Sequence, residues 1–444
     1  MSTQLRSSKS KIQRHWHALC RQIGHRTAGS RGERRAADYI EDCLHQLKLD
    51  HVGRHSFDFP NWASSACELK AGPTRPDRSI RSARASVYSV STPPAGVRGP
   101  LAYLQSGSPL DFAQPLKGRI GLLIGSLALA DENVKRRLMR SGLKALVNVD
   151  TRVPFAWPTS NGSAPQWVRG FRLPMAGIAY LDAIRLVEQI PLSAHLTIEA
   201  RRFPDTSHSV MGEVVGRTRP EEVILVSGHH DCVDENVGAD DNGSGVIFML
   251  ELARLLSRQC PRRTVRFISY GVEERLSVGS YQYMMSLTRA EQRRIVLAVN
   301  ADSVSSAVGT DDVLVTATPD LDRLVRRVWQ GRKHAARISS SVHGYSDHFP
   351  FNIAGVPSVS LGRRSIEGGS SWQLHSRHDN LDHVSADVLA RTIDTAAVLL
   401  NRVAGASTLP FRRSIAPKLA REVATFARDT YRHPWSAKGF DYDS

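Results

Sequence analysis

A short apolar run that ends in histidine and aspartate is the feature that most constrains the fold. Residues 223–226 lead into Gly228-His229-His230-Asp231, and Gly238-Ala239-Asp240-Asp241-Asn242-Gly243-Ser244-Gly245 follows closely. Beyond this motif, apolar residues recur at the spacing of one helix face: Val246, Met249, Leu250, Ala253 and Leu256. The pattern predicts a buried strand, a loop and a helix. Strand ends of this kind are where open α/β sheets bind ligands.

Two further strand-like runs end in acidic residues. Residues 264–270 are followed by Glu273 and Glu274, and residues 295–300 are followed by Asp302. Two later motifs add more imidazole and carboxylate groups: Ser346-Asp347-His348 and Leu374-His375-Ser376-Arg377-His378-Asp379. Imidazole and carboxylate are the ligands that first-row metal ions such as zinc take in proteins. The motifs therefore predict a metal site.

Such a set suits the hydrolysis of an amide bond, which needs an activated water and a polarised carbonyl. Two Zn²⁺ ions about 3.5–4 Å apart can share one water and lower its pKa towards about 7. They need a bridging carboxylate, histidine and terminal carboxylates, while one more carboxylate stays off the metal and takes the water's proton. Because neighbouring side chains diverge, Glu273 and Glu274 can divide these two tasks.

In this order, the motifs resemble the dizinc exopeptidase family, which includes bacterial leucyl aminopeptidases, aminopeptidase Y and glutamate carboxypeptidase. The resemblance extends from about Ile23 to about Ala404. It implies an α/β fold with a mixed, mostly parallel central sheet flanked by helices. It also implies a hydrolase that holds a pair of zinc ions and acts on peptides.

The same resemblance implies the metal ligands. Asp241 would bridge both zinc ions, Glu274 and His375 would complete one site, and His229 and Asp302 would complete the other.

Two further roles follow from the resemblance. Glu273 would be the general base, and Asp231 would orient His229, as metal-bound histidine usually requires. The peptide bond between Asp241 and Asn242 would be cis.

Some positions depart from the family pattern. After the paired glutamates the family often has x-Gly-Leu-x-Gly-Ser, whereas this chain has Arg275-Leu276-Ser277-Val278-Gly279-Ser280, without the first glycine. Leu374-His375-Ser376 stands in place of a common Tyr-His-Thr, and Asn380 in place of a common threonine. No proposed ligand is lost, and the changes concern the shape of the substrate pocket.

Other interpretations stay open. Taken singly, an Asp-Asp-Asn-Gly run is typical of a turn with a helix cap, and paired glutamates are typical of a solvated helix start. Among enzymes, an aminopeptidase is favoured. A carboxypeptidase of the same family, a glutaminyl cyclase with one zinc, and a receptor-like protein with a dead site are the alternatives.

Composition restricts the partners and the compartment. The net charge of +16 comes mostly from arginines scattered along the chain, and no motif of a nucleic-acid-binding module accompanies them, so no specific nucleic-acid partner is expected. The five cysteines show no paired spacing. The start of the chain lacks the apolar region of a signal peptide, and no run is long enough for a transmembrane helix. A cytoplasmic location is the expectation.

The chain divides into four segments. Residues 1–74 would form the first part of the peptidase domain, and residues 196–404 its main part. Residues 75–195 resemble an inserted, smaller α/β protease-associated domain, and residues 405–444 form a basic tail with one short amphipathic helix.

Overall fold

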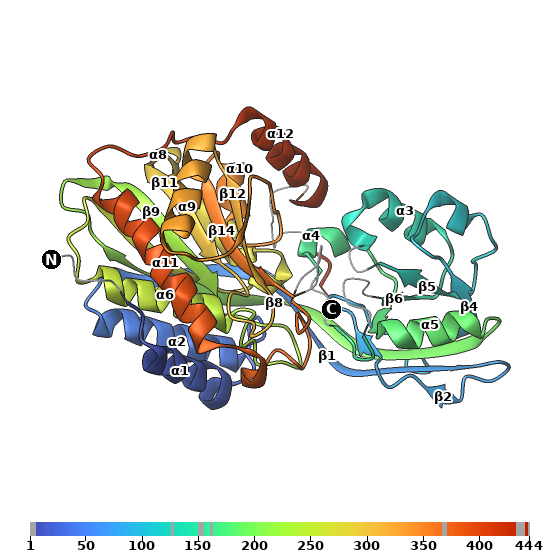
Figure 1. Ribbon diagram of the computed structural model, residues 1–444. Helices are drawn as coiled ribbons and strands as arrows, with labels where there is room; N and C mark the ends of the chain where they lie inside the picture. Colours follow the sequence, from blue (N-terminus) through green and yellow to red (C-terminus); the bar gives the residue numbers. More distant parts are fainter. Residues whose placement is uncertain are drawn as a thin grey trace. The chain divides into compact units, whose positions relative to one another are not determined.

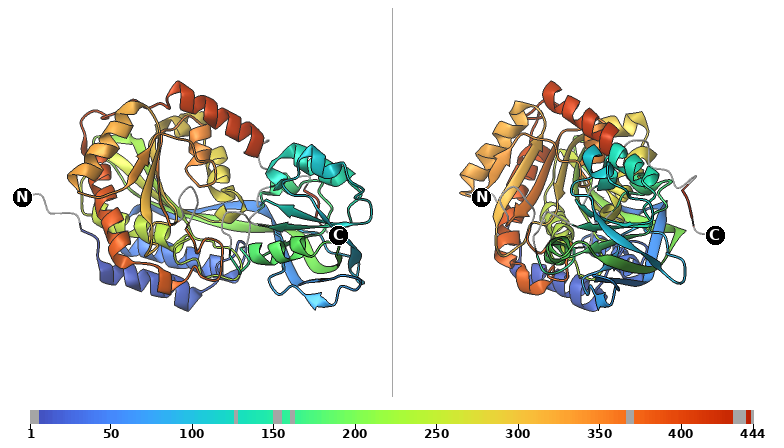
Figure 2. Two further views of the ribbon diagram at one scale, coloured as in Figure 1. Left: turned by 45° about the vertical axis from the view of Figure 1, so that its right-hand side comes forward. Right: turned by 90° about the vertical axis from the view of Figure 1, so that its right-hand side faces the viewer.

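The computed structural model describes residues 6–125, 128–149, 155–159, 163–365, 371–431 and 440–442 (Figure 1, Figure 2). Two compact units make up the chain. The large unit comprises Met1–Phe57 and Thr206–Arg428, and the small unit comprises Asp58–Asp205 and Asp429–Ser444. The strands β1 (Asp50–Gly72) and β8 (Ser193–Val214) contribute residues to both.

The large unit is built on a mixed sheet. Its other strands are β9 (Arg219–His229), β10 (Arg263–Tyr270), β11 (Ile295–Ala301), β12 (Thr310–Thr316), β13 (Arg337–Ser339) and β14 (Ser358–Arg364). They lie in the order β13-β12-β14-β11-β9-β10-β8. β9 pairs in parallel with β10 and β11, β11 with β14, and β12 with β13, whereas β10–β8 and β12–β14 are antiparallel. The mostly parallel sheet is confirmed.

Apolar side chains on both faces of this sheet are covered by helices. On β9, Ile224 and Val226 join the larger core cluster, whereas Val223 and Leu225 join a second one, because successive side chains of a strand point to opposite faces. The larger cluster includes residues of α1 (Lys9–Trp16), α2 (Arg31–Gln46), α6 (Gly243–Leu256), α9 (Pro319–Gly331) and α11 (Ala386–Gly405). The second includes residues of α7 (Val278–Ser286) and α10 (Phe349–Ile353).

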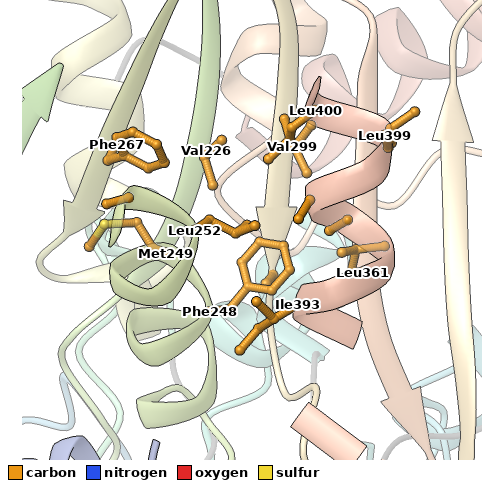
Figure 3. Packing of buried hydrophobic residues seen from close by; sticks show 14 of the residues in the cluster. Val226, Phe248, Met249, Leu252, Phe267, Val299, Leu361, Ile393, Leu399 and Leu400 are labelled. Carbon is orange, nitrogen blue, oxygen red and sulfur yellow. The ribbon is translucent and has the colours of Figure 1, made fainter. Parts of the chain in front are cut away.

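Helix α6 is more deeply buried than its sequence predicts. The predicted apolar face lies in the core, but Phe248 and Leu252 are fully buried as well. The reason is its position between the sheet and the helices α1, α2 and α11, all of which it contacts. Figure 3 shows Phe248, Met249 and Leu252 beside side chains of α11 and of the central strands. A helix that is apolar all round is typical of such a buried position.

The small unit contains a second α/β sheet. Its strands are β3 (Arg84–Ala85), β4 (Val97–Tyr103), β5 (Ile120–Ile124), β6 (Ala145–Val149) and β7 (Met175–Ile178). From β4 through β5 and β6 to β7 they run in parallel. The helices are α3 (Glu132–Arg140), α4 (Pro165–Val168) and α5 (Tyr180–Glu188). The alternation of strands and helices in this unit agrees with the expected α/β character of the segment 75–195.

The boundaries of the small unit are wider than the expected insertion. It extends from Asp58 to Asp205 rather than from residue 75 to 195, and it takes in Asp429–Ser444 from the expected tail. Before that point, the tail forms α12 (Pro417–Phe426), which buries Leu419 and Val423 as its amphipathic pattern predicts. Residues 432–439 and 443–444 of the tail lie outside the described residues. Among the described helices, none has both the length and the apolar character of a membrane span.

Candidate metal centre

The ends of three parallel strands bring the candidate ligands together. His229 is the last residue of β9. Glu273 and Glu274 lie in a short 3₁₀ turn just after β10, and Asp302 directly follows β11. Because β10 and β11 flank β9 in parallel, their carboxyl ends meet at one edge of the sheet. Topology alone therefore places an imidazole and three carboxylates side by side.

Two histidines face carboxylate oxygens in two groups that share Asp241. His229 Nε2 lies 3.2 Å from Asp241 Oδ1 and 3.7 Å from Asp302 Oδ1. His375 Nε2 lies 3.3 Å from Asp241 Oδ2 and 3.2 Å from Glu274 Oε2. Donors about 2.0–2.2 Å from a tetrahedral zinc ion lie about 3.3–3.6 Å from one another. The spacing of both donor sets therefore fits zinc, with one oxygen of the shared carboxylate in each.

Burial of the donors points the same way. His229, Asp241 and Glu274 are buried, and one donor atom of each lies within 4.8 Å of the others. His229 Nε2 and Glu274 Oε1 have no hydrogen-bond partner among the described residues. Buried polar atoms normally have one. These residues fit a pair of zinc ions, which would satisfy the atoms that the protein leaves open.

The crowding of acids in a buried site shifts their pKa values. Burial raises the pKa of Glu273 well above its usual value, and the charges of Asp347 and Asp302 raise it further against the effect of His229. Burial also raises the pKa of Glu274. For His229, burial lowers the pKa, but the surrounding carboxylates, Glu273 first, bring it well above 6.5. Bound positive charge, such as that of metal ions, would therefore stabilise this cluster of carboxylates.

Asp231 does more than orient His229. Its Oδ1 lies 3.4 Å and its carbonyl oxygen 3.2 Å from His229 Nδ1. A proton on Nδ1 leaves Nε2 free for a metal ion. In addition, Asp231 Oδ1 accepts the backbone N–H of Glu273 at 2.9 Å and Oδ2 accepts that of Glu274 at 3.1 Å. The same carboxylate thus holds both the histidine and the turn with the paired glutamates.

Asp379 has a role that its motif does not reveal. Its two oxygens accept the backbone N–H groups of Asp240 at 2.7 Å and of Asp241 at 2.9 Å. It thereby fixes the backbone of the shared carboxylate from 138 residues away in the sequence. The run from Leu374 to Asp379 marks this residue as a candidate for the site, but not the contact that it makes. The peptide bond between Asp241 and Asn242 is cis, as the resemblance implies.

A chain of hydroxyl and amide groups orients Asp302. Ser346 Oγ donates to Asp302 Oδ2 at 2.5 Å and accepts from Asn300 Nδ2 at 2.8 Å. Ser227 Oγ in turn donates to Asn300 Oδ1 at 2.7 Å. The Ser-Asp-His motif therefore contributes its serine to the site.

Asp347, His348 and His230 belong to the same motifs, but none of them faces Asp241 in the donor sets described above. Asp347 is fully buried, and burial raises its pKa to about 7, with a further rise from Asp302. His348 is also buried, which lowers its pKa to about 3. His230 Nδ1 lies 3.1 Å from Ser269 Oγ, so this ring is turned to a hydroxyl group rather than to Asp241.

Comparison with known proteins gives the ancestry of this site. The model of peptidase family M28 matches residues 209–400. Aminopeptidase YwaD of Bacillus subtilis is 30% identical over 396 residues, which cover 86% of this chain and 82% of that protein. Carboxypeptidase Q of Mus musculus is 26% identical over 63% of this chain and 62% of its own. The structure of a zinc aminopeptidase from Bacillus subtilis aligns with a TM-score of 0.75 at 24% identity, covering 94% of this chain and 99% of that one.

The family match lies over the site itself. Residues 209–400 include every candidate ligand, the paired glutamates, Asp231 and Asp379. The similarity to Aminopeptidase YwaD extends over most of both chains, and the solved zinc aminopeptidase has the same fold. The chain belongs to peptidase family M28.

Proposed function

We propose that the protein is a zinc-dependent exopeptidase and that it removes residues from the amino terminus of peptides. The observation that carries the proposal is the shared carboxylate of Asp241, whose two oxygens face His229 and His375 separately. The similarity to Aminopeptidase YwaD supports the choice of the amino terminus.

In this proposal, five residues would hold two zinc ions. His229 and Asp302 would bind one ion, Glu274 and His375 the other, and Asp241 both. When bound, such a pair polarises a carbonyl and lowers the pKa of water. Asp231, Asp379 and Ser346 would keep the ligands in place through the hydrogen bonds described above.

Glu273 is the proposed general base. Ser277 Oγ donates to its Oε1 at 3.1 Å, which fixes one oxygen, and Oε2 lies 3.7 Å from His229 Nε2 at the edge of the donor set. Oε2 is therefore the oxygen of Glu273 that can take a proton from water. The same Oε2 would then deliver that proton to the leaving amine.

Hydrolysis of leucyl-p-nitroanilide tests this function. We expect turnover that needs zinc, two zinc ions per chain by metal analysis, and no cleavage of N-acetylated peptides at their amino end. Release of the last residue from an N-blocked peptide would favour the carboxypeptidase alternative. One zinc with cyclisation of N-terminal glutamine would favour the cyclase, and bound zinc without turnover would favour a receptor-like protein.

The Asp241→Ala variant tests the bridging role. Loss of one carboxylate that serves both ions should weaken both zinc sites together. Metal analysis after dialysis should find less than one zinc per chain. Retention of two tightly held ions would contradict the bridging role of Asp241. The peptidase reaction would still be tested separately by the hydrolysis of leucyl-p-nitroanilide.

We also propose that the protein works in the cytoplasm. All five cysteines are free thiols, and proteins of oxidising compartments usually pair theirs. Fractionation of cells that produce the full chain is the test. Recovery of the protein outside the cytoplasm would contradict the proposal.

A further inference from the structure

The turn that carries Glu273 has a backbone shape that its own residues disfavour. Val272, Leu276 and Ser277 have φ angles of 57°, 70° and 50°. Residues with a Cβ atom seldom adopt positive φ, and a β-branched or bulky residue does so least of all. Such a conformation persists only where the surrounding structure enforces it. The contacts of this turn therefore decide where the Glu273 carboxylate lies.

Two buried carboxylates accept hydrogen bonds from three successive N–H groups of the turn. Asp231 accepts from Glu273 and Glu274, as described above. Glu33 Oε1 accepts from the N–H of Val272 at 3.2 Å. The two acids thus hold the N–H groups before and after the Cα atom of Val272, the first residue of the turn with a positive φ.

Glu33 is itself held firmly. It lies in the first turn of α2 and is 2% exposed. Its Oε1 also accepts from Ser207 Oγ at 2.9 Å, and its Oε2 accepts from the N–H of Gly29 at 2.6 Å. Glu33 therefore links the start of α2 and the strand β8 to the turn after β10.

Helix capping alone does not explain this glutamate. The cap of α2 is Ser30, whose Oγ accepts the N–H of Glu33 at 3.1 Å. The side chain of Glu33 satisfies one N–H before the helix with one oxygen and uses the other for Ser207 and Val272. A residue that served only the helix would not need to be buried against the turn.

We propose that Glu33 is a positioning residue for catalysis: through the N–H of Val272, it sets the turn that aims the carboxylate of Glu273. The proposal rests on the proposed function, because Glu273 is the proposed base. Glu33 would bind no metal and touch no substrate. Its removal should change the rate of the chemical step and leave the zinc content and the binding of substrate nearly unchanged.

Kinetics of Glu33→Ala and Glu33→Gln give the first test. We expect kcat to fall between about 10-fold and 100-fold in Glu33→Ala, since a displaced catalytic group can cost that much. Glutamine keeps one acceptor oxygen, so Glu33→Gln should lose less. KM should stay within about twofold, with two zinc ions retained. Glu41→Gln is the matched control, because Glu41 lies on the same helix and pairs with Arg54 at the surface.

A glycine at position 276 separates positioning from mere packing. Glycine takes positive φ freely, so Leu276→Gly should reduce the dependence of the turn on Glu33. In the Glu33→Gln background, it should recover part of the lost kcat. Equal losses with and without the glycine would contradict a restraint on the backbone of the turn.

Hydrogen exchange gives a measurement that does not depend on activity. Removal of Glu33 should speed amide exchange in the segment 271–278 and leave the amides of β11 unchanged. If the wild-type protein hydrolyses no peptide, the proposed function fails, and this exchange still decides whether Glu33 holds the turn. Unchanged exchange together with unchanged kcat in a folded, zinc-loaded Glu33→Gln variant would overturn the proposal.

Discussion

Residue by residue, the site separates the groups that would bind metal from the groups that hold them. Asp241 faces both histidines with its side chain, while Asp379 accepts its backbone N–H. Asp302 is oriented by Ser346. Positions of reacting groups need to be accurate to a fraction of an ångström, and such supporting hydrogen bonds supply that accuracy.

The paired glutamates should respond differently to the same substitution. Glu273→Gln should keep both zinc ions and lose about 10²–10⁴-fold in kcat, because an amide cannot accept the proton. Glu274→Gln should lower zinc affinity instead, since its Oε2 is a proposed ligand atom 3.2 Å from His375 Nε2. Metal analysis and kcat, measured on both variants, show which glutamate is the base and which is the ligand. Opposite behaviour would reverse the two roles.

The residues of the site differ in how far their sequence could predict them. His229, Glu273 and Asp302 follow strand-like runs, so local pattern places them at the sheet edge. The contacts of Glu33 and Asp379 could not be predicted in this way, because each joins segments more than 100 residues apart. Periodicity reports only neighbours within a few residues.

At the scale of elements, the close packing of α6 on the sheet explains the glycines around Asp241. A Cβ atom at Gly245 would lie 2.3 Å from the carbonyl oxygen of Ala301, and one at Gly228 would lie 2.7 Å from the backbone of Gly245. Helix and strand therefore meet backbone to backbone at this point. Asn242 caps the helix by accepting the N–H of Gly245 at 2.8 Å.

A methyl group at this contact should be costly. In Gly245→Ala, the new Cβ would meet the Ala301 carbonyl oxygen at 2.3 Å and Asn242 Oδ1 at 2.4 Å, and the backbone of Ala301 cannot move aside as the end of a flexible side chain could. We expect the free energy of unfolding in urea to fall by about 1–3 kcal/mol, as overpacking does in other cores. Gly331→Ala is the control, since nothing lies within 4 Å of that position and its cost should be close to zero. Equal effects in both would contradict the close contact.

The length of an element and its full burial were harder to foresee than its type. The pattern of α6 predicts one apolar face, yet its neighbours α1 and α11 come from both ends of the chain and bury the remainder. Likewise, β1 extends over 23 residues without a clear alternation, and the sequence gives no signal for it. Both features depend on partners distant in the chain.

For the whole molecule, buried acids make stability depend on pH when zinc is absent. Burial raises the pKa of Glu33 to about 8, helped by the charge of Asp231, and that of Asp347 to about 7. An acid with a raised pKa in the folded state binds protons that the unfolded chain has lost above about pH 4. Its contribution to stability is therefore complete below that pH and disappears as the pH rises through the folded value.

The expected result is a metal-free protein that loses stability between about pH 7 and pH 8.5. This range lies above the ordinary histidine pKa of about 6.5, so the buried histidines with lowered pKa values, such as His348, no longer add stability there as the pH rises. Urea unfolding after treatment with EDTA should show this fall, and Glu33→Gln should reduce its upper part near pH 8. Zinc should oppose the fall, because metal binding favours deprotonated ligands. A metal-free protein that gains stability over this range would contradict the assignment of these buried acids.

The hydrogen bond between Glu33 and Val272 also joins two residues that are 239 positions apart. During translation, Glu33 is synthesised long before Val272, and the segment Asp58–Asp205 is made between them. Contacts of such long range form late, because the intervening chain must be closed into a loop first. The segment from β9 onward supplies Asp231, which holds Glu273 and Glu274, whereas α2 supplies Glu33. On the proposed role of Glu33, a chain in which α2 has not yet reached the turn would hydrolyse peptides more slowly than the mature protein, and full activity would come only with this contact.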